Sequence, residues 1–196
     1  GDGTGEDSAI PVDVINFPNA ASISAGDNHT CGLDSSGAAF CWGFNGGGAC
    51  GNGTFTEYIL SPVSVTGLSS GVLTISAGDN FSCAVTGAGA AQCWGANYWG
   101  QLGNGLSGDN QYQNVPNQVT GLTSGITSIT TGSMFACAFT NLGGEKCWGY
   151  GADGELGNGS FGNSNIPVNV TGLSSGVVAI SAGSYHACAL LETGGV

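Results

Sequence analysis

Residues 83–95 read Cys-Ala-Val-Thr-Gly-Ala-Gly-Ala-Ala-Gln-Cys-Trp-Gly, and the same frame of two cysteines ten positions apart followed by Trp-Gly recurs at 31–43 and 137–149. An Ala-Gly or Thr-Gly pair also recurs at intervals of 51 to 54 residues. Such self-similarity marks a repeat protein. A period near 50 with many glycines predicts β-propeller blades, because no stretch has the uninterrupted apolar period of 3.6 residues that a helical solenoid requires.

Each repeat is predicted to contain four short strands, which in the second repeat lie at 72–76, 81–86, 90–95 and 115–119. If Cys83 faces Cys93, the hairpin between the middle strands closes with a three-residue loop ending in Gly89, and glycine is favoured in the left-handed position of such a loop. The predicted fold class is therefore all-β, with four-stranded propeller-type blades; the alternative is an open β-arc or filament of blades. The repeat boundaries are predicted near 1–52, 53–104, 105–158 and 159–196, the last repeat being incomplete.

The regular cysteines predict disulfides within the hairpins, namely Cys31–Cys41, Cys83–Cys93 and Cys137–Cys147. A zinc site would need converging Cys-x2-Cys or His pairs, which this spacing does not provide, and we predict no metal or cofactor site. Two alternatives stay open for Cys50, which stands where other repeats have leucine: a buried free thiol, or a bond with the other orphan, Cys188. Because disulfides persist in oxidising compartments, an extracellular or cell-surface location is predicted.

The chain is strongly acidic, with 13 Asp and Glu residues, one basic residue (Lys146) and a net charge of -12. Affinity for phosphates comes from Lys and Arg, so we expect no nucleic-acid partner and no docking on anionic membranes. No apolar run reaches the length of a membrane span, so no membrane insertion is expected. Sequons occur by chance in chains rich in Asn, Ser and Thr, but a secreted glycoprotein would carry sugars at such sites. The predicted glycosylation sites are Asn28, Asn52, Asn80, Asn158 and Asn169.

Residues 94–105, Trp-Gly-Ala-Asn-Tyr-Trp-Gly-Gln-Leu-Gly-Asn-Gly, resemble the Trp-Gly-x-Asn-x-x-Gly-Gln-Leu-Gly-x-Gly signature of the regulator of chromosome condensation repeat family. Residues 148–159 are similar to it, and the Ile-Ser-Ala-Gly-x-x-His run ending at His186 matches the family's other landmark. The resemblance implies a β-propeller, usually of seven four-stranded blades. It implies no single function, because propellers with very different roles share this fold. The regular disulfides resemble those of extracellular members.

The repeat frame is interrupted at both termini. Residues 1–4 align with 51–54, and the cysteine expected to pair with Cys188 would fall at position 198, beyond Val196. The missing strand is expected to come from the rest of a longer chain or from a neighbouring copy, or the chain is a truncated four-blade unit. Residues 11–15 are expected to form an outer strand with no inner partner. An open sheet edge is a template for assembly.

The function predicted from these features is structural or binding, and the chain is not expected to be an enzyme. His29 and His186 occupy a position held by phenylalanine in the other repeats, so packing is predicted for them. We interpret the chain as an extracellular module of propeller repeats, a subunit or segment of a cell-surface or filamentous assembly. Its expected partners are other copies of itself or the rest of a longer chain.

Two alternative functions involve other partners. The first is a discrete protein-binding propeller that captures or inhibits an extracellular enzyme. Its candidate binding residues are Tyr98 and Trp99, because adjacent aromatic residues of this kind are enriched at binding hot spots. The second is an enzyme that acts on an extracellular glycan with Asp153 and Glu155 as a carboxylate pair, although short acidic loop pairs are usually solvated.

Overall fold

The computed structural model describes residues 1–17 and 19–196, and the regular structure within these ranges is entirely β. Blade 1 contains β1 (Ala20–Ala25), β2 (His29–Asp34), β3 (Ala39–Phe44) and β4 (Tyr58–Ser64). Blade 2 contains β5 (Val72–Ala77), β6 (Phe81–Thr86), β7 (Ala91–Gly95) and β8 (Gln113–Gln118). Blade 3 contains β9 (Ile126–Thr131), β10 (Phe135–Thr140), β11 (Glu145–Gly149) and β12 (Ser164–Asn169). Blade 4 contains β13 (Val177–Ala182) and β14 (Ala187–Leu191).

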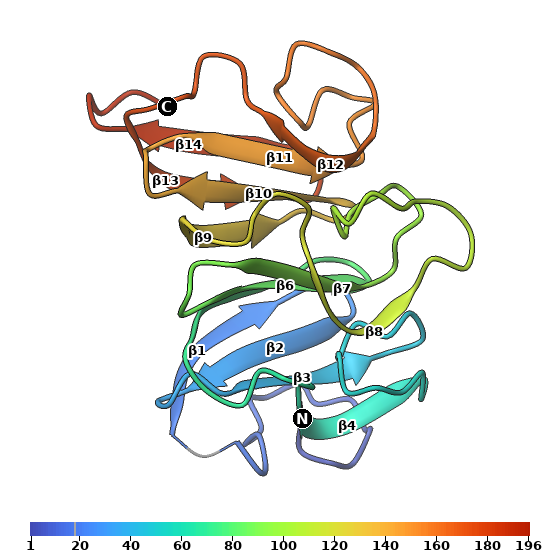
Figure 1. Cartoon of the computed structure of the whole chain (residues 1–196). Helices are drawn as coiled ribbons and strands as arrows, with labels where there is room; N and C mark the ends of the chain where they lie inside the picture. Colours follow the sequence, from blue (N-terminus) through green and yellow to red (C-terminus); the bar gives the residue numbers. More distant parts are fainter. Residues whose placement is uncertain (18) are drawn as a thin grey trace.

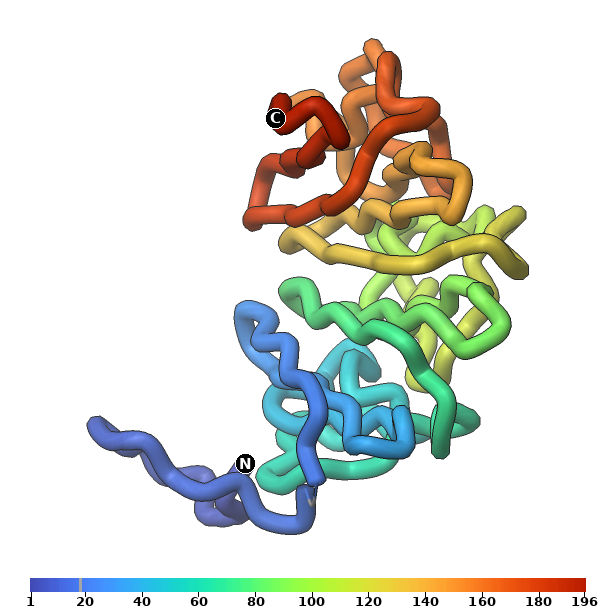
Figure 2. The backbone as a smooth tube through the Cα atoms, turned by 90° about the vertical axis from the view of Figure 1, so that its left-hand side faces the viewer, coloured from blue at the N-terminus to red at the C-terminus, as the bar shows by residue number. Residues whose placement is uncertain are grey.

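The blades follow one another in chain order and form an open arc (Figure 1). In each blade the strands are antiparallel and pair in sequence order, and the innermost strands β1, β5, β9 and β13 lie next to one another. The first and last blades lie at opposite ends of the arc in both views (Figures 1 and 2). The apolar core lies between neighbouring blades. No helix among the described residues is long and apolar enough to cross a membrane.

The middle hairpin of each blade has the predicted register. Cys83 lies opposite Cys93, Val85 lies opposite Ala91, and Gly89 closes the loop with a φ of 74°. The corresponding cysteines of blades 1 and 3 also face each other, and the three pairs are bonded, with Cα–Cα separations of 4.0, 4.1 and 4.1 Å. Each pair joins the two middle strands of one blade, as the sequence predicts.

Tryptophan connects neighbouring blades. The indole N–H of Trp94 in blade 2 donates to the carbonyl of Ala49 in blade 1 at 2.8 Å, and Trp148 in blade 3 donates to the carbonyl of Gln101 in blade 2 at 2.9 Å. Both side chains are fully buried. A Cβ added to Gly51 would lie 2.6 Å from the Trp94 indole nitrogen, so only glycine allows the preceding blade to approach this closely.

The expected outer strand at residues 11–15 is not formed, and this part of the prediction is wrong. A strand needs a hydrogen-bonded neighbour, and the described residues provide no inner strand for this segment. The segment nevertheless makes one hydrogen bond that the other outer segments also make. The amide of Ile15 donates to the carbonyl of Gly1 at 3.1 Å, as Thr66 does to Gly51 at 2.9 Å.

Removing one disulfide is expected to lower the free energy of unfolding by roughly 2.5 to 3 kcal/mol, because the bond closes an eleven-residue loop in the unfolded chain. The variant carries both Cys83→Ala and Cys93→Ala, and urea denaturation measures its free energy of unfolding. The control is Cys188→Ser, which removes an exposed, unpaired thiol. An equal effect of the two changes would show that the hairpin bond contributes nothing to stability.

Candidate binding sites

An aromatic cleft lies at the end of the blades where β5 turns into β6 and where β7 leaves its sheet. Tyr98 and Trp99 are 44% and 40% exposed, although both are large aromatic residues. Each makes an edge-to-face contact with a further tyrosine: the ring centroids of Tyr98 and Tyr112 are 5.4 Å apart, and so are those of Trp99 and Tyr150. Each of the two candidate side chains therefore packs against one other aromatic ring at the surface.

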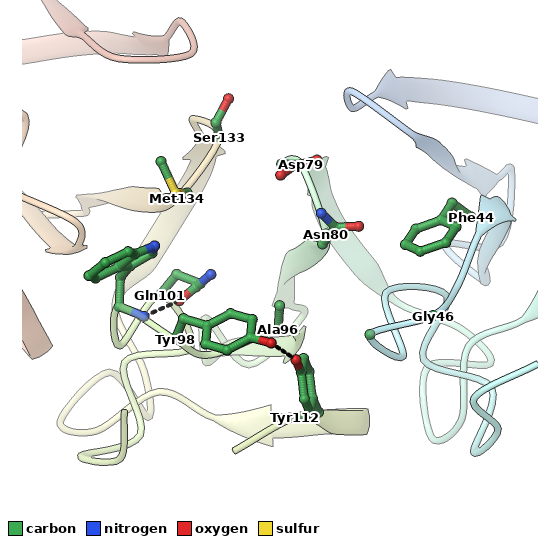
Figure 3. A pocket seen from close by; sticks show the side chains of 12 residues that line it. Phe44, Gly46, Asp79, Asn80, Ala96, Tyr98, Gln101, Tyr112, Ser133 and Met134 are labelled. Carbon is green, nitrogen blue, oxygen red and sulfur yellow. Dashed lines mark hydrogen bonds between the residues drawn. The ribbon is translucent and has the colours of Figure 1, made fainter. Parts of the chain in front are cut away.

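All three complete blades contribute to the cleft, which has a volume of about 390 Å³. Phe44 and Gly46 of blade 1 lie across it from Ser133 and Met134 of blade 3 (Figure 3). Blade 2 supplies the remaining walls, and there the hydroxyl groups of Tyr98 and Tyr112 are hydrogen-bonded to each other. The cleft is therefore formed by three blades together, although the sequence indicated only the Tyr98–Trp99 pair.

The polar part of the cleft is acidic and amide-rich. Asp79 and Asn80 lie in the turn between β5 and β6, and both line the cleft. One oxygen of Asp79 accepts a hydrogen bond from Asn28 of blade 1 at 2.7 Å, which fixes the carboxylate at the boundary between the blades. The Oδ1 atom of Asn80 is buried and has no hydrogen-bond partner among the described residues. The cleft thus offers hydrogen-bond acceptors beside aromatic faces.

A second candidate site is the edge of β14, where a pocket of about 240 Å³ lies between blades 3 and 4. Its walls include Glu155, Gly157 and Val170 of blade 3 together with Cys188 of blade 4. In sequence register, Glu155 and Gly157 correspond to Gln101 and Gly103, which receive Trp148. The pocket therefore repeats, at the next blade interface, the environment of the buried tryptophans.

The apolar lining supports the same correspondence. A Cβ on Gly103 would lie 2.9 Å from a methyl group of Val119, and one on Gly157 would lie 2.9 Å from a methyl group of Val170. Leu156 is fully buried beneath the pocket, as Leu102 is beneath Trp148. Among the described residues, β14 pairs with β13 alone, whereas the equivalent strand β6 pairs on both sides.

The two cysteines outside the hairpins are free and not bonded to each other. Cys50 is fully buried in the core between blades 1 and 2, and burial raises the pKa of its thiol to about 12. It is therefore an inert thiol. Cys188 is exposed and lines the β14 pocket, in the position that Cys83 has in blade 2. Sequence reasoning identified Cys188 as an orphan but could not place it in a pocket.

Asp153 and Glu155, the predicted carboxylate pair, both line the β14 pocket. The carboxylate of Glu155 accepts a hydrogen bond from the amide of Asp153 at 3.0 Å, while Asp153 accepts one from the Tyr150 hydroxyl at 3.3 Å. One cluster in the described chain has metal-ligand spacing, and it consists of Cys137, Glu145 and Cys147. Its two sulfur atoms are joined to each other, so they are not available as thiolate ligands.

His29 is 3% exposed and packs between blades 1 and 2, as predicted. The predicted packing of His186 is wrong: His186 is exposed, because no further blade lies against blade 4 in the described part of the chain. The Nε2 atom of His29 lies 2.7 Å from the Ser82 side-chain oxygen, and the Ser82 hydroxyl donates to the carbonyl of Ala49 at 2.9 Å. Nε2–H is therefore the donor of a neutral ring. Nδ1 is buried without a partner in the described chain. Desolvation lowers the pKa of His29 to about 4, because a buried imidazolium is disfavoured.

His29 is expected to make stability depend on pH. The unfolded state binds a proton near pH 6.5 and the folded state near pH 4, so the stabilisation is complete above pH 6.5 and decreases as the pH falls towards 4. We expect the free energy of unfolding to be roughly 2 to 3 kcal/mol lower at about pH 4.5 than at neutral pH because of this group. His29→Phe, which introduces the residue of blades 2 and 3, should remove this part of the pH dependence in urea titrations. An unchanged profile would contradict the assignment.

The repeat signature has a direct counterpart in known proteins. The sequence model of the Regulator of chromosome condensation (RCC1) repeat matches residues 36–85, 89–139 and 147–190, which together are well over half of the chain. The chain belongs to this family. A relative of this RCC1-repeat chain is the Arabidopsis thaliana RCC1 domain-containing protein RUG3, mitochondrial, which is 30% identical over 179 residues. That alignment covers 89% of the chain and 40% of RUG3, so the RCC1-repeat chain spans about two fifths of this relative's length.

Solved structures show the same RCC1 fold. Prp20p from Saccharomyces cerevisiae, described with its binding properties to Gsp1p and histones, superposes with a TM-score of 0.77 at 18% identity. The match covers 87% of this chain and 43% of Prp20p. The ectodomain of the Physcomitrella patens receptor kinase CR4 is 26% identical with a TM-score of 0.52, covering 89% of this chain and 39% of that protein. RCC1 repeats are protein-binding modules, and this chain is built of them.

Proposed function

We propose that this chain is a structural and binding module of an extracellular assembly and that it joins the assembly through the edge of β14. The observation that carries the proposal is the pocket beside the free Cys188, whose lining corresponds to the surroundings of Trp148. A strand carrying Cys-Trp-Gly would fill this edge. Its cysteine would reach Cys188, and its indole N–H would meet the carbonyl of Glu155, by analogy with Trp148 and Gln101.

The length of a relative supports one source of that strand. The chain covers 40% of RUG3, which supports a strand from the rest of a longer polypeptide. A strand from a second copy is the alternative. The Cys-Trp-Gly strands at 41–43, 93–95 and 147–149 pair within their own blades, so a second copy would have to exchange one of them. Such a heterologous interface would build filaments. The energetic reason is the same in both cases: strand addition pairs the open backbone groups of β14 and buries the apolar pocket lining.

The experiment uses a synthetic peptide with the sequence of residues 89–95, Gly-Ala-Ala-Gln-Cys-Trp-Gly, supplied as its glutathione mixed disulfide. The Cys188 thiolate attacks the peptide sulfur, a new disulfide forms, and glutathione leaves as a thiolate. Mass spectrometry then measures the adduct. The control peptide has Ala in place of Trp. The Cys188→Ser variant should form no adduct, which identifies Cys188 as the site of attachment.

We expect the tryptophan peptide to reach roughly tenfold higher occupancy of Cys188 than the alanine peptide, because a buried aromatic anchor is worth more than about 1.4 kcal/mol. Equal occupancy by the two peptides would mean that the pocket does not bind the tryptophan side chain, and the proposal would fail. Sedimentation of the unmodified chain distinguishes the two sources, because self-association requires a strand donated by a second copy.

The extracellular location is supported by the three disulfides and by the likeness to the CR4 ectodomain. We expect protein from its natural source to carry glycans at Asn52, Asn158 and at least one of Asn28, Asn80 and Asn169, because four of these sequons lie in turns. Asn169 ends β12. Intact-mass measurement before and after deglycosylation tests this expectation. The mass of the bare polypeptide would contradict it.

A further inference from the structure

The aromatic cleft has exposed aromatic rings and polar groups that take no part in the proposed assembly through β14. Tyr98 and Trp99 expose part of their rings at the surface and contact Tyr112 and Tyr150 edge to face. The charged group beside these rings is the carboxylate of Asp79, and the amide side chains of Asn80 and Gln101 also line the cleft. Aromatic faces and acceptors share one preference, because both attract a cation or a charged N–H donor.

Charge around the cleft points to the same class of ligand. Asp27 accepts a hydrogen bond from Ser133 at 3.1 Å, which places a second carboxylate beside the cleft wall. The one basic residue of the chain, Lys146, lines a different cavity together with the β10–β11 hairpin. With a net charge of -12, the surface repels anions and attracts cations. The cleft is therefore complementary to a positively charged partner.

We propose that the cleft binds an arginine-bearing segment of a partner protein. The guanidinium group would stack on the Tyr98 or Trp99 ring, where cation–π attraction operates within about 6 Å of the ring centroid. Its N–H groups would then donate to the carboxylate of Asp79, which lines the cleft. Arginine fits better than lysine, because its planar fork combines stacking with several directed donors. Histidine and lysine have only part of this capacity.

The cleft is independent of the β14 edge, so each proposal can fail without the other. Its walls come from blades 1, 2 and 3, whereas the β14 pocket lies between blades 3 and 4. The proposal also requires that Asn80 carries no glycan, because a sugar there would occupy the cleft. Site-specific glycan mapping of the native protein therefore gives a first check, and full occupancy of Asn80 would overturn the proposal.

Binding is tested with a fluorescein-labelled Gly/Ser peptide that carries three arginines, measured by fluorescence anisotropy. A peptide with citrulline in place of arginine has the same shape without the charge. We expect the arginine peptide to bind at least about tenfold more tightly and to weaken several-fold when the salt rises from about 50 to about 300 mM, because screening reduces the attraction. Equal binding of the two peptides, or no binding of the arginine peptide, would overturn the proposal.

Matched variants localise the binding. Trp99→Ala should raise the Kd for the arginine peptide about tenfold, and Asp79→Asn should raise it several-fold. The controls are Phe161→Ala, which removes an aromatic residue that is 80% exposed elsewhere, and Asp13→Asn at an exposed site. Both controls should leave the Kd unchanged. Aromatic clefts with carboxylates also suit sugars, so chitotetraose and cellotetraose are tested in parallel. A sugar that binds in a Trp99-dependent manner while the arginine peptide does not would replace this proposal.

Discussion

Replacing Trp94 by alanine is expected to lower the free energy of unfolding by roughly 3 to 5 kcal/mol, the usual cost of emptying a large buried aromatic site. Trp94 is fully buried between blades 1 and 2, and its removal also leaves the carbonyl of Ala49 without its indole donor. Urea denaturation measures the effect. Because the side chain joins two blades, the variant should also unfold with reduced cooperativity.

The matched control is Trp99→Ala, the same chemical change at a site that is 40% exposed. It should cost less than about 1 kcal/mol, because surface substitutions away from the core have small effects. If both variants lost the same stability, the tryptophans of the Cys-Trp-Gly motif would not be the residues that hold neighbouring blades together.

Gly95→Ala is expected to destabilise the chain by roughly 4 kcal/mol. Gly95 ends the Cys-Trp-Gly motif with a φ of 110°, where a side chain is strained by about 1 to 3 kcal/mol. An added Cβ would also lie 2.5 Å from the Asn80 carbonyl oxygen and 2.5 Å from the Cα atom of Phe81. These are backbone atoms of the neighbouring strand and cannot move without opening the sheet, so crowding adds about 1 to 3 kcal/mol.

The control for this change is Gly105→Ala. Gly105 has a φ of 85°, but nothing lies within 4 Å of an added Cβ. Its cost should therefore be limited to the backbone term, about 1 to 2 kcal/mol. Thermal unfolding of the two variants side by side separates backbone strain from crowding. A similar loss in both would show that the close approach at Gly95 is not what makes the glycine necessary.

Periodic features of the fold could be predicted from the sequence because a repeat supplies the same evidence several times. The cysteine frame and the loop glycine Gly89 gave one hairpin register, and the pairing of Val85 with Ala91 follows from it. Residues 11–15 were predicted wrongly as a strand, because their pattern matches the outer strands while pairing depends on a neighbour that the pattern does not encode.

The binding sites could be predicted only in part. Tyr98 and Trp99 were recognisable as an adjacent pair outside the repeat, but Phe44 and Met134 join them only through the packing of three blades. The turn before β6 and the loop after β7 lie at the same end of the sheet, because β6 and β7 are antiparallel neighbours, so the hairpin register predicts that these two segments meet. The exposed Cys188 was visible as an orphan, whereas its pocket depends on loop residues of blade 3.

Hydrogen–deuterium exchange of β14 tests most directly whether this strand is an open binding edge. In the free chain, the segment Ala187–Leu191 should exchange much faster than Phe81–Thr86, its counterpart in blade 2, because β6 is paired on both sides. Addition of the Cys-Trp-Gly peptide should slow exchange in β14 and leave β6 unchanged. If β14 is already as protected as β6 in the free chain, or remains fast when the peptide is attached to Cys188, the edge does not accept a strand and the proposed mode of assembly is wrong.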